Sequence, residues 1–165
     1  MDELIDDFIL AHNDFVVIKS KDLNKLPSIF NKTDRLFSFP PNGNIARSEI
    51  EHYLDINYKN ELVGFYKIID LRFEHVIELH GSFSKPESFL VRSYFDLTKK
   101  FVAKVRLQWP GHSITSVIHK DNLKVKSFLS FLDFVETSFD ENYVLYKFCL
   151  LYTSDAADEL RCVDI

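Results

Sequence analysis

Glycine and cysteine are scarce in this sequence, and each scarcity excludes a kind of site. The 165 residues contain only four glycines, which leaves little room for a glycine-rich loop that holds phosphates. Both cysteines lie after residue 148. Residues 1–148 therefore offer no disulfide, no thiol nucleophile and no zinc–thiolate site.

Long apolar runs and an excess of positive charge are also missing. No apolar run approaches the roughly 20 residues that a membrane-spanning helix needs. The formal net charge of −5 argues against broad binding to the phosphate backbone of nucleic acids. The first ten residues, MDELIDDFIL, are acidic, whereas a secretion signal begins with positive charge. We expect a cytoplasmic protein without a membrane or nucleic-acid partner.

Bulky apolar side chains are abundant. Hydrophobic residues make up 46% of the chain and include 16 phenylalanines, against 27% charged residues. This composition is typical of a folded protein with a packed core. The length suits a single domain.

The composition changes at residue 149. Residues 149–165 read CLLYTSDAADELRCVDI, in which phenylalanine is absent and small and acidic residues gather. The run CLLYTSDAADE, followed by CVD, resembles the in-frame translation of a sequencing adaptor. We expect residues 1–148 to form the domain and residues 149–165 to be a non-native tail, with a native frayed end as the alternative.

The first 60 residues are predicted to hold one strand among helices. Residues 15–18 read FVVI, a run with strand composition. Apolar spacing predicts helices over 2–12 and 23–37, a loop follows at 39–43, and Ser48 and Glu51 have the spacing of a capping box for a helix over 48–57.

Strands and helices alternate from residue 61 onward. Residues 61–71 (ELVGFYKIIDL) and 73–83 (FEHVIELHGSF) predict two adjacent antiparallel strands. A capping box of Ser84 and Glu87 then precedes a helix with apolar residues at Leu90, Tyr94, Leu97, Phe101 and Val105, which ends at residues 109–112. A strand at 114–119, a helix at 123–134 and a strand at 143–148 complete an α/β fold, a mixed sheet with helices on its faces.

This order resembles that of the GNAT superfamily of acyl-CoA-dependent N-acyltransferases over about residues 15–148. The most specific piece is ITSVIHKDNLKVKSFLSFLDF, in which Leu132 and Phe134 follow Asn122 at the family's spacings of ten and twelve. The resemblance implies a twisted, mostly antiparallel sheet. It also implies transfer of an acyl group, expected to be acetyl from acetyl-CoA, to the amine of a small molecule or peptide.

Three family features are replaced in this sequence. SKPESFLVRS (84–93) stands in place of the glycine-containing pyrophosphate loop, Leu129 in place of a general-acid tyrosine, and Asp133 in place of a glycine. Without a tyrosine at 129, the leaving thiolate would take its proton from solvent, from Tyr94 or from Tyr143. An inactive GNAT-like module for binding or assembly is the alternative function.

Glu78 and His80 are the candidate catalytic bases. They lie two residues apart on a predicted strand, so their side chains share a face. A histidine pKa near 6.5 suits removal of a proton at neutral pH. The alternative is an ordinary polar face of a strand.

The resemblance places acyl-CoA against the end of that strand and the start of the next helix, whose free N–H groups can bind pyrophosphate without glycine. An ordinary capped helix is the alternative. Asn122 is implied to hydrogen-bond the pantetheine arm, and a turn residue is its alternative. The expected cofactor-binding residues are Leu79, Gly81, Phe83, Ser84, Lys85, Ser88 and Asn122.

Three further groups of residues have simpler interpretations. Glu78, His80, His112 and His119 have the ligand types of a nitrogen–oxygen metal site, but no spacing brings them together, and we expect no metal. Trp109, Tyr94 and the stripe of phenylalanines are expected in the core or at its rim rather than in a ligand site. Lys99, Lys100, Lys104 and Arg106 are expected on a solvated helix face.

Overall fold

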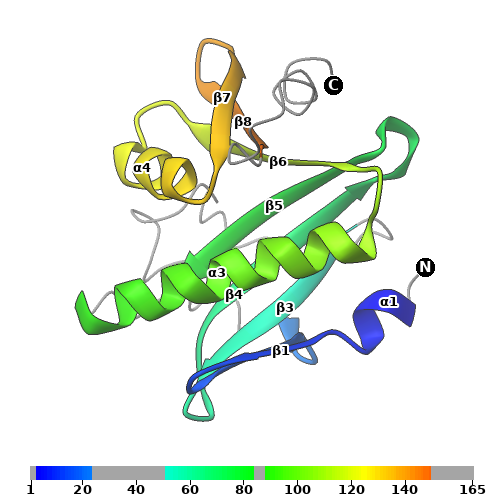
Figure 1. The fold of residues 1–165 in the computed structure, drawn as a ribbon, viewed down its shortest axis with the longest axis vertical. Helices are drawn as coiled ribbons and strands as arrows, with labels where there is room; N and C mark the ends of the chain where they lie inside the picture. The colour runs from blue at the N-terminus through cyan, green and yellow to red at the C-terminus, as the bar shows by residue number, and fades with distance from the viewer. Residues whose placement is uncertain (1–2, 24–50, 84–87, 150–165) are drawn as a thin grey trace, which may run out of the picture.

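The computed structural model describes residues 3–23, 51–83 and 88–149, and these form one sheet of eight strands with helices packed against it (Figure 1). The strands follow one another across the sheet in the order β1-β2-β3-β4-β5-β6-β8-β7. The elements are α1 (Glu3–Asp6), β1 (Ile9–His12), β2 (Phe15–Lys19), β3 (Glu51–Tyr58), β4 (Glu61–Leu71), η2 (Arg72–Glu74), β5 (Val76–Phe83), α3 (Ser88–Gln108), β6 (Ser113–His119), α4 (Leu123–Phe131), β7 (Phe134–Phe139) and β8 (Tyr143–Phe148).

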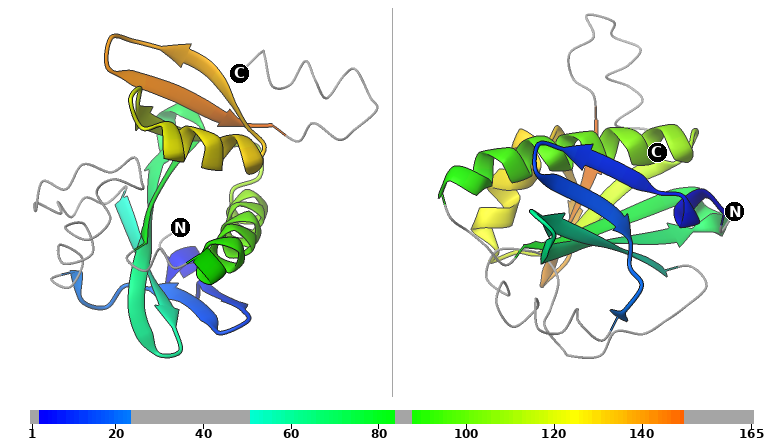
Figure 2. Two further views of the ribbon diagram at one scale, coloured as in Figure 1. Left: turned by 90° about the vertical axis from the view of Figure 1, so that its left-hand side faces the viewer. Right: turned by 90° about the horizontal axis from the view of Figure 1, so that it is seen from below.

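Strands β5 and β6 form the parallel pair of this sheet, and the other described neighbours are antiparallel. A parallel pair needs a crossover connection, which α3 supplies. Figure 2 shows α3 lying along one face of the sheet, with α4 beside the β7–β8 hairpin. The predicted α/β fold, with a mixed and mostly antiparallel sheet, is confirmed.

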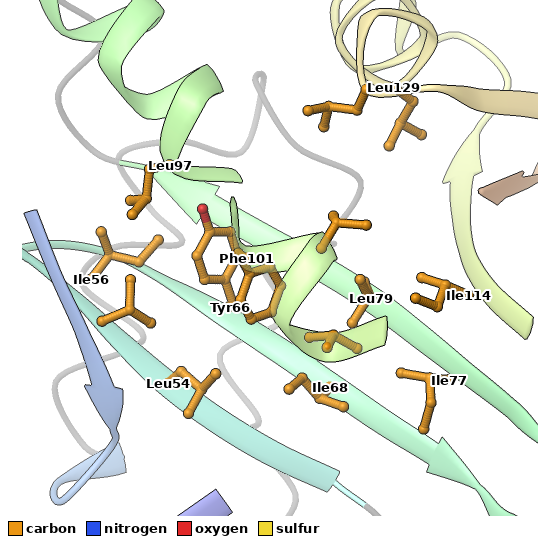
Figure 3. Close-up of a cluster of buried hydrophobic side chains, with 14 of the residues drawn as sticks. Leu54, Ile56, Tyr66, Ile68, Ile77, Leu79, Leu97, Phe101, Ile114 and Leu129 are labelled. Atoms are coloured by element: carbon orange, nitrogen blue, oxygen red, sulfur yellow. The ribbon is translucent and has the colours of Figure 1, made fainter. Parts of the chain in front are cut away.

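The core lies between α3 and the sheet (Figure 3). Leu97 and Phe101 of α3 are at most 1% exposed, as are Leu54 and Ile68 of the sheet. The ring of Phe101 stacks on that of Tyr66 with centroids 3.9 Å apart and planes 4° from parallel. Burying each such side chain contributes about 1.5–3 kcal/mol, so α3 is fixed firmly over β3, β4 and β5. Tyr94 and Trp109 are buried in the same core, as predicted.

Two predicted helices are wrong because their residues pair as strands. Within 2–12, the helix stops at Asp6, and Ile9–His12 forms β1 against β2 through a turn in which Asn13 has a φ of 52°. Within 48–57, Glu51–Tyr58 is β3, bonded to β2 and β4 on its two sides. Cross-strand pairing outweighs a short stretch of helical spacing, since helix propensity is a weak preference that tertiary context overrides.

The end of the predicted helix at 123–134 is also corrected. The helix α4 ends at Phe131, and Phe134 opens β7, a strand that the sequence pattern did not predict. Between them Asp133 has a φ of 66°, the left-handed conformation in which helices commonly terminate on glycine. The predicted strands at 15–18, 61–71, 73–83, 114–119 and 143–148 and the helix through Leu90–Val105 are confirmed, with ends shifted by a few residues.

Some predictions fall outside the described residues. These are the helix at 23–37, the loop at 39–43, the capping boxes at Ser48 and at Ser84–Glu87, and the tail beyond Cys149. Cys149 itself is buried and its N–H donates to the Asp133 carbonyl oxygen at 2.8 Å. Among the described helices, none is long and apolar enough to cross a membrane.

Candidate functional site

Strands β5 and β6 stay together for only three residue pairs, the last of which is Glu78–Thr115. Beyond it, β5 continues to Phe83 paired with β4, and β6 continues to His119 paired with β8. The two strands therefore diverge within the sheet (Figure 1). A cavity of about 50 Å³ lies at this divergence, lined by Leu79, His80 and Gly81 of β5, Ser116 of β6, and side chains of α3, α4 and the start of β7. We call it the notch.

The edge of β5 that faces the notch carries backbone hydrogen-bonding groups. The His75 carbonyl accepts from the Ser113 N–H at 2.9 Å, so the peptide groups of His75 point toward β6. Successive residues of a strand alternate the direction of these groups, and Leu79 and Gly81 therefore point theirs the same way. Since the described parallel ladder ends at Glu78–Thr115, the Gly81 N–H and C=O face the notch.

Gly81 brings this edge close to two buried tyrosines. A Cβ atom at position 81 would lie 3.2 Å from Tyr94 Oη and 3.3 Å from Tyr66 Cδ1. Both tyrosines line the notch. The lack of a side chain at Gly81 thus lets the Tyr94 hydroxyl lie directly against β5.

The tyrosine hydroxyls belong to a buried network with Thr98. The Thr98 hydroxyl donates to the Tyr94 carbonyl at 2.9 Å, so in the 2.7 Å contact between Tyr66 Oη and Thr98 Oγ1 the tyrosine is the donor. Burial raises the pKa of both Tyr66 and Tyr94 well above the ordinary value. Both hydroxyls therefore keep their protons throughout the neutral and mildly alkaline range.

Glu78 and His80 lie on the opposite face of β5 from Leu79 and Gly81. Their side chains are joined by a hydrogen bond of 2.5 Å between Glu78 Oε1 and His80 Nε2, and only 20% and 10% of them, respectively, is exposed. Burial acts to raise the pKa of Glu78, but the hydrogen bond and electrostatic interaction with His80 and the positive charge of Lys67 lower it overall. Glu78 is therefore ionised at neutral pH and holds the imidazole in place.

A second buried ion pair lies beside this one. Lys67 is opposite His80 in the β4–β5 register, and its Nζ is 3.0 Å from Glu51 Oε1 of β3. Both groups are mostly buried. The face of the sheet away from α3 therefore carries a polar, charged cluster next to the notch, whereas the face toward α3 is apolar.

The structure brings together part of the predicted site. Leu79 and Gly81 line the notch, and Glu78 and His80 are paired at its edge. Phe83 lies in the core, where its ring stacks on Tyr94 with centroids 4.2 Å apart, and it does not line the notch. Ser84 and Lys85 lie outside the described residues, and Ser88 is the first residue of α3.

Asn122 has a structural position. It is the N-cap of α4, where its Oδ1 accepts from the Val125 N–H at 3.3 Å, and its own N–H donates to the His119 carbonyl at 3.0 Å. It does not line the notch. The capping role agrees with the turn interpretation, and a contact with pantetheine stays a prediction.

The alternative metal site is not assembled. Within the ranges that the structure describes, no three histidine, cysteine or acidic side chains gather closely enough to hold a metal ion. His112 and His119 lie at opposite ends of β6, the first beside His75 and the second beside Tyr143. Tyr143, which the sequence offered as a proton source for the thiolate, is 45% exposed and does not line the notch.

Sequence reasoning missed Tyr66, Thr98 and Ser116 as lining residues of the notch. Strand alternation alone could have indicated Tyr66, which is paired with Gly81 across β4 and β5. Leu129 of α4, which the resemblance sets in place of a tyrosine, lines the notch.

The comparisons with known proteins concern the fold. No protein-family model matches the sequence, and neither does any curated protein sequence. Solved structures do match the fold, and the chain has the fold of the GNAT acetyltransferases. The ribosomal-protein-S5-alanine acetyltransferase from Vibrio fischeri has a TM-score of 0.60 at 15% identity, over 86% of this chain and 96% of that one.

Two further structures extend the likeness. A GNAT-family acetyltransferase from Bacillus anthracis gives a TM-score of 0.64 at 13% identity, over 85% of this chain and 97% of that one. The Campylobacter jejuni N-acetyltransferase PseH, solved with acetyl coenzyme A, gives 0.51 at 9% identity, over 61% and 68%. At these identities the likeness concerns the fold, and the chemistry must be argued from the site.

Proposed function

We propose that the protein is an acyl-CoA-dependent N-acyltransferase, with acetyl as the expected acyl group and an amine as the acceptor. The observation that carries the proposal is the notch, where β5 and β6 separate directly after Glu78–Thr115 beside a cavity. The GNAT fold of the chain and the acetyl coenzyme A in the PseH structure support it.

The residues around the notch fit the arm of acyl-CoA. Its amides would add to the edge of β5 that faces the notch as a strand does, by hydrogen bonds to the Leu79 and Gly81 backbone. Val125 and Leu129 of α4 supply an apolar wall for its methylene groups. The Gly81 N–H would donate to the thioester carbonyl oxygen. When bound, acyl-CoA supplies an activated acyl carbon.

The Glu78–His80 pair supplies the base. An amine must lose a proton as its nitrogen attacks a carbonyl carbon. His80 lies at the edge of the notch with its Nε2 held by the ionised Glu78. Glu78 stabilises the imidazolium that forms when His80 accepts this proton, directly or through water. The acceptor would thus approach from the charged face of the sheet, opposite the apolar side of the notch.

Calorimetric titration of acetyl-CoA into the full chain tests the proposal, with two matched valine variants. Val125 lines the notch and Val144 does not, and both are 3% exposed. Val125→Phe is expected to fill the cavity and reduce affinity at least tenfold, whereas Val144→Phe adds the same group elsewhere and keeps the affinity.

The stability of the complex gives a second readout. At a ligand concentration of 100 times Kd, binding stabilises the native state by about 2.7 kcal/mol, which raises Tm clearly. Release of CoA with a panel of peptide and polyamine acceptors then tests catalysis. A wild-type chain with no saturable binding at millimolar acetyl-CoA would contradict the proposal and favour an inactive binding module.

A further inference from the structure

Two histidines meet at the end of the β5–β6 pair that lies away from the notch. His75 directly precedes β5 and His112 directly precedes β6, and the first residues of these strands, Val76 and Ser113, are paired. The two turns lie at the same end of the sheet (Figure 1). The imidazole rings are 5.5 Å apart between centroids, with planes 68° from parallel. His75 is exposed and His112 partly exposed, so an ion from solvent can reach both.

The backbone holds both histidines in place. His75 has a φ of 53°, a left-handed conformation that histidine adopts more readily than most residues, and its carbonyl accepts a hydrogen bond of 2.9 Å from the first N–H of β6. The His112 N–H donates to the Trp109 carbonyl at 3.3 Å. Between them stand Pro110 and Gly111, whose φ of 82° completes the pattern of a type II turn. The two rings are therefore neighbours without any rearrangement of the chain.

The hydrogen bonding of His112 suits a metal ligand. Its Nδ1 lies 3.5 Å from the Pro110 carbonyl oxygen. A carbonyl oxygen only accepts, so Nδ1 carries the proton and Nε2 of the neutral ring keeps a lone pair. Metal-bound histidines usually donate their other N–H to such a group. Two imidazoles on one tetrahedral zinc ion have ring centres about 5–6 Å apart, given metal–nitrogen distances of about 2.0–2.1 Å. The observed separation lies in this range.

We propose that His75 and His112 form a two-histidine site for a divalent transition-metal ion such as Zn²⁺, with water in its other coordination positions. Neutral imidazole suits these ions, whereas Mg²⁺ and Ca²⁺ take oxygen ligands. In the part of the chain that the structure describes, no third histidine, cysteine or acidic side chain completes the set, so the site is open to solvent. The bound ion ties the start of β5 to the start of β6, and this role is independent of the proposed function.

Calorimetric titration of ZnCl₂ into the full chain, prepared without a histidine tag, tests the site. The wild type is expected to bind Zn²⁺ saturably. His75→Asn keeps a residue that tolerates the left-handed backbone, and His112→Gln leaves the turn before β6 intact. Each should weaken zinc binding by about tenfold or more. His119→Gln is the matched control, because His119 is an exposed histidine of β6 whose Nδ1 lies 3.7 Å from Asp121 Oδ2, and it should keep the wild-type Kd.

Copper gives a second readout that counts the ligands. Cu²⁺ binds nitrogen sites more tightly than Zn²⁺, and its electron paramagnetic resonance spectrum should show two imidazole nitrogens in the wild type and one in either His75→Asn or His112→Gln. A wild-type chain with no saturable binding at millimolar ZnCl₂ overturns the proposal. So does zinc binding that is undiminished in either of these variants, since the ion then lies on other groups of the chain, or an equal loss in His119→Gln.

Discussion

Gly81→Ala is expected to destabilise the protein, because two tyrosines occupy the space of its missing side chain. The new Cβ would lie 3.2 Å from Tyr94 Oη and 3.3 Å from Tyr66 Cδ1. Carbon atoms reach their best contact at about 3.5–4.0 Å. One of the neighbours must therefore move by a few tenths of an ångström.

Neither tyrosine can retreat easily. The Tyr66 ring is stacked on Phe101 at 3.9 Å, and the Tyr94 ring on Phe83 at 4.2 Å. Overpacking of a core typically costs about 1–3 kcal/mol. Replacing glycine by alanine within a regular element returns about 0.5–1 kcal/mol through backbone entropy. The free energy of unfolding should fall by about 1 kcal/mol in balance.

A double-mutant cycle measured by urea unfolding isolates the contact. Tyr94→Phe removes the oxygen that the new Cβ meets, so the double variant should be less destabilised than the sum of the two single variants by about 0.5–1 kcal/mol. If the losses of unfolding free energy in the two single variants sum to that of the double variant within about 0.3 kcal/mol, the placement of Tyr94 beneath Gly81 is refuted. A Gly81→Ala variant that is more stable than the wild type would refute it too.

Two further predictions concern the edge of the notch and the end of α4. Glu78 has a lowered pKa, since the hydrogen bond and electrostatic interaction with His80 and the charge of Lys67 together outweigh the opposing effect of burial. Its carboxylate therefore stabilises the fold above its ordinary pKa of 4.5, and this contribution is lost as the pH falls through the lower native value. In urea unfolding, Glu78→Gln should lower the free energy of unfolding most at neutral pH. The difference in free energy between this variant and the wild type should become smaller below the ordinary pKa of 4.5. A difference that does not change with pH would contradict the lowered pKa of Glu78. Asp133 has a φ of 66°, so Asp133→Gly should raise the free energy of unfolding by about 0.5–1 kcal/mol and Asp133→Ala should lower it. An alanine variant more stable than the glycine variant would show that the backbone at this residue is not strained.

The part of the fold that determines the site was predictable from sequence. The two runs at 61–71 and 73–83 are rich in β-branched and aromatic residues, and they are β4 and β5. The spacing of Tyr94, Leu97 and Phe101 marks the buried stripe of α3. These segments are long and strongly patterned, so local signals agree with the tertiary structure.

The N-terminal half was predicted less well, for a physical reason. Residues 51–58 carry apolar side chains on both faces of β3, including Tyr53 and Leu54. A strand in the middle of a sheet buries both faces, so the alternation that marks strands is lost and a helical spacing can arise by chance. A better signal was the pair Lys59–Asn60, whose φ values of 49° and 64° form the turn to β4, because hairpins favour asparagine at such positions.

The sequence named part of the strand lining of the notch but not its helix lining. Leu79, His80 and Gly81 of β5 line the notch, and Glu78 is paired with His80 at its edge, while their roles in binding and catalysis stay predictions. Which part of α3 lies under the notch depends on where β5 and β6 separate, and sequence spacing does not encode that point. Asp133 in place of a family glycine is explained by its left-handed backbone, which aspartate tolerates better than most residues.

The claim that a thioester arm binds between β5 and β6 can be tested most directly because the chain has so few glycines. Selective ¹⁵N-glycine labelling of this chain gives four backbone amide signals, from Gly43, Gly64, Gly81 and Gly111, and Gly81→Ala identifies its own by removing it. On addition of acetyl-CoA, the Gly81 signal should shift markedly, because its N–H faces the notch, while Gly111, an exposed residue of the turn before β6, should stay in place. A Gly81 signal that stays unchanged at millimolar acetyl-CoA would contradict binding of the thioester arm between β5 and β6.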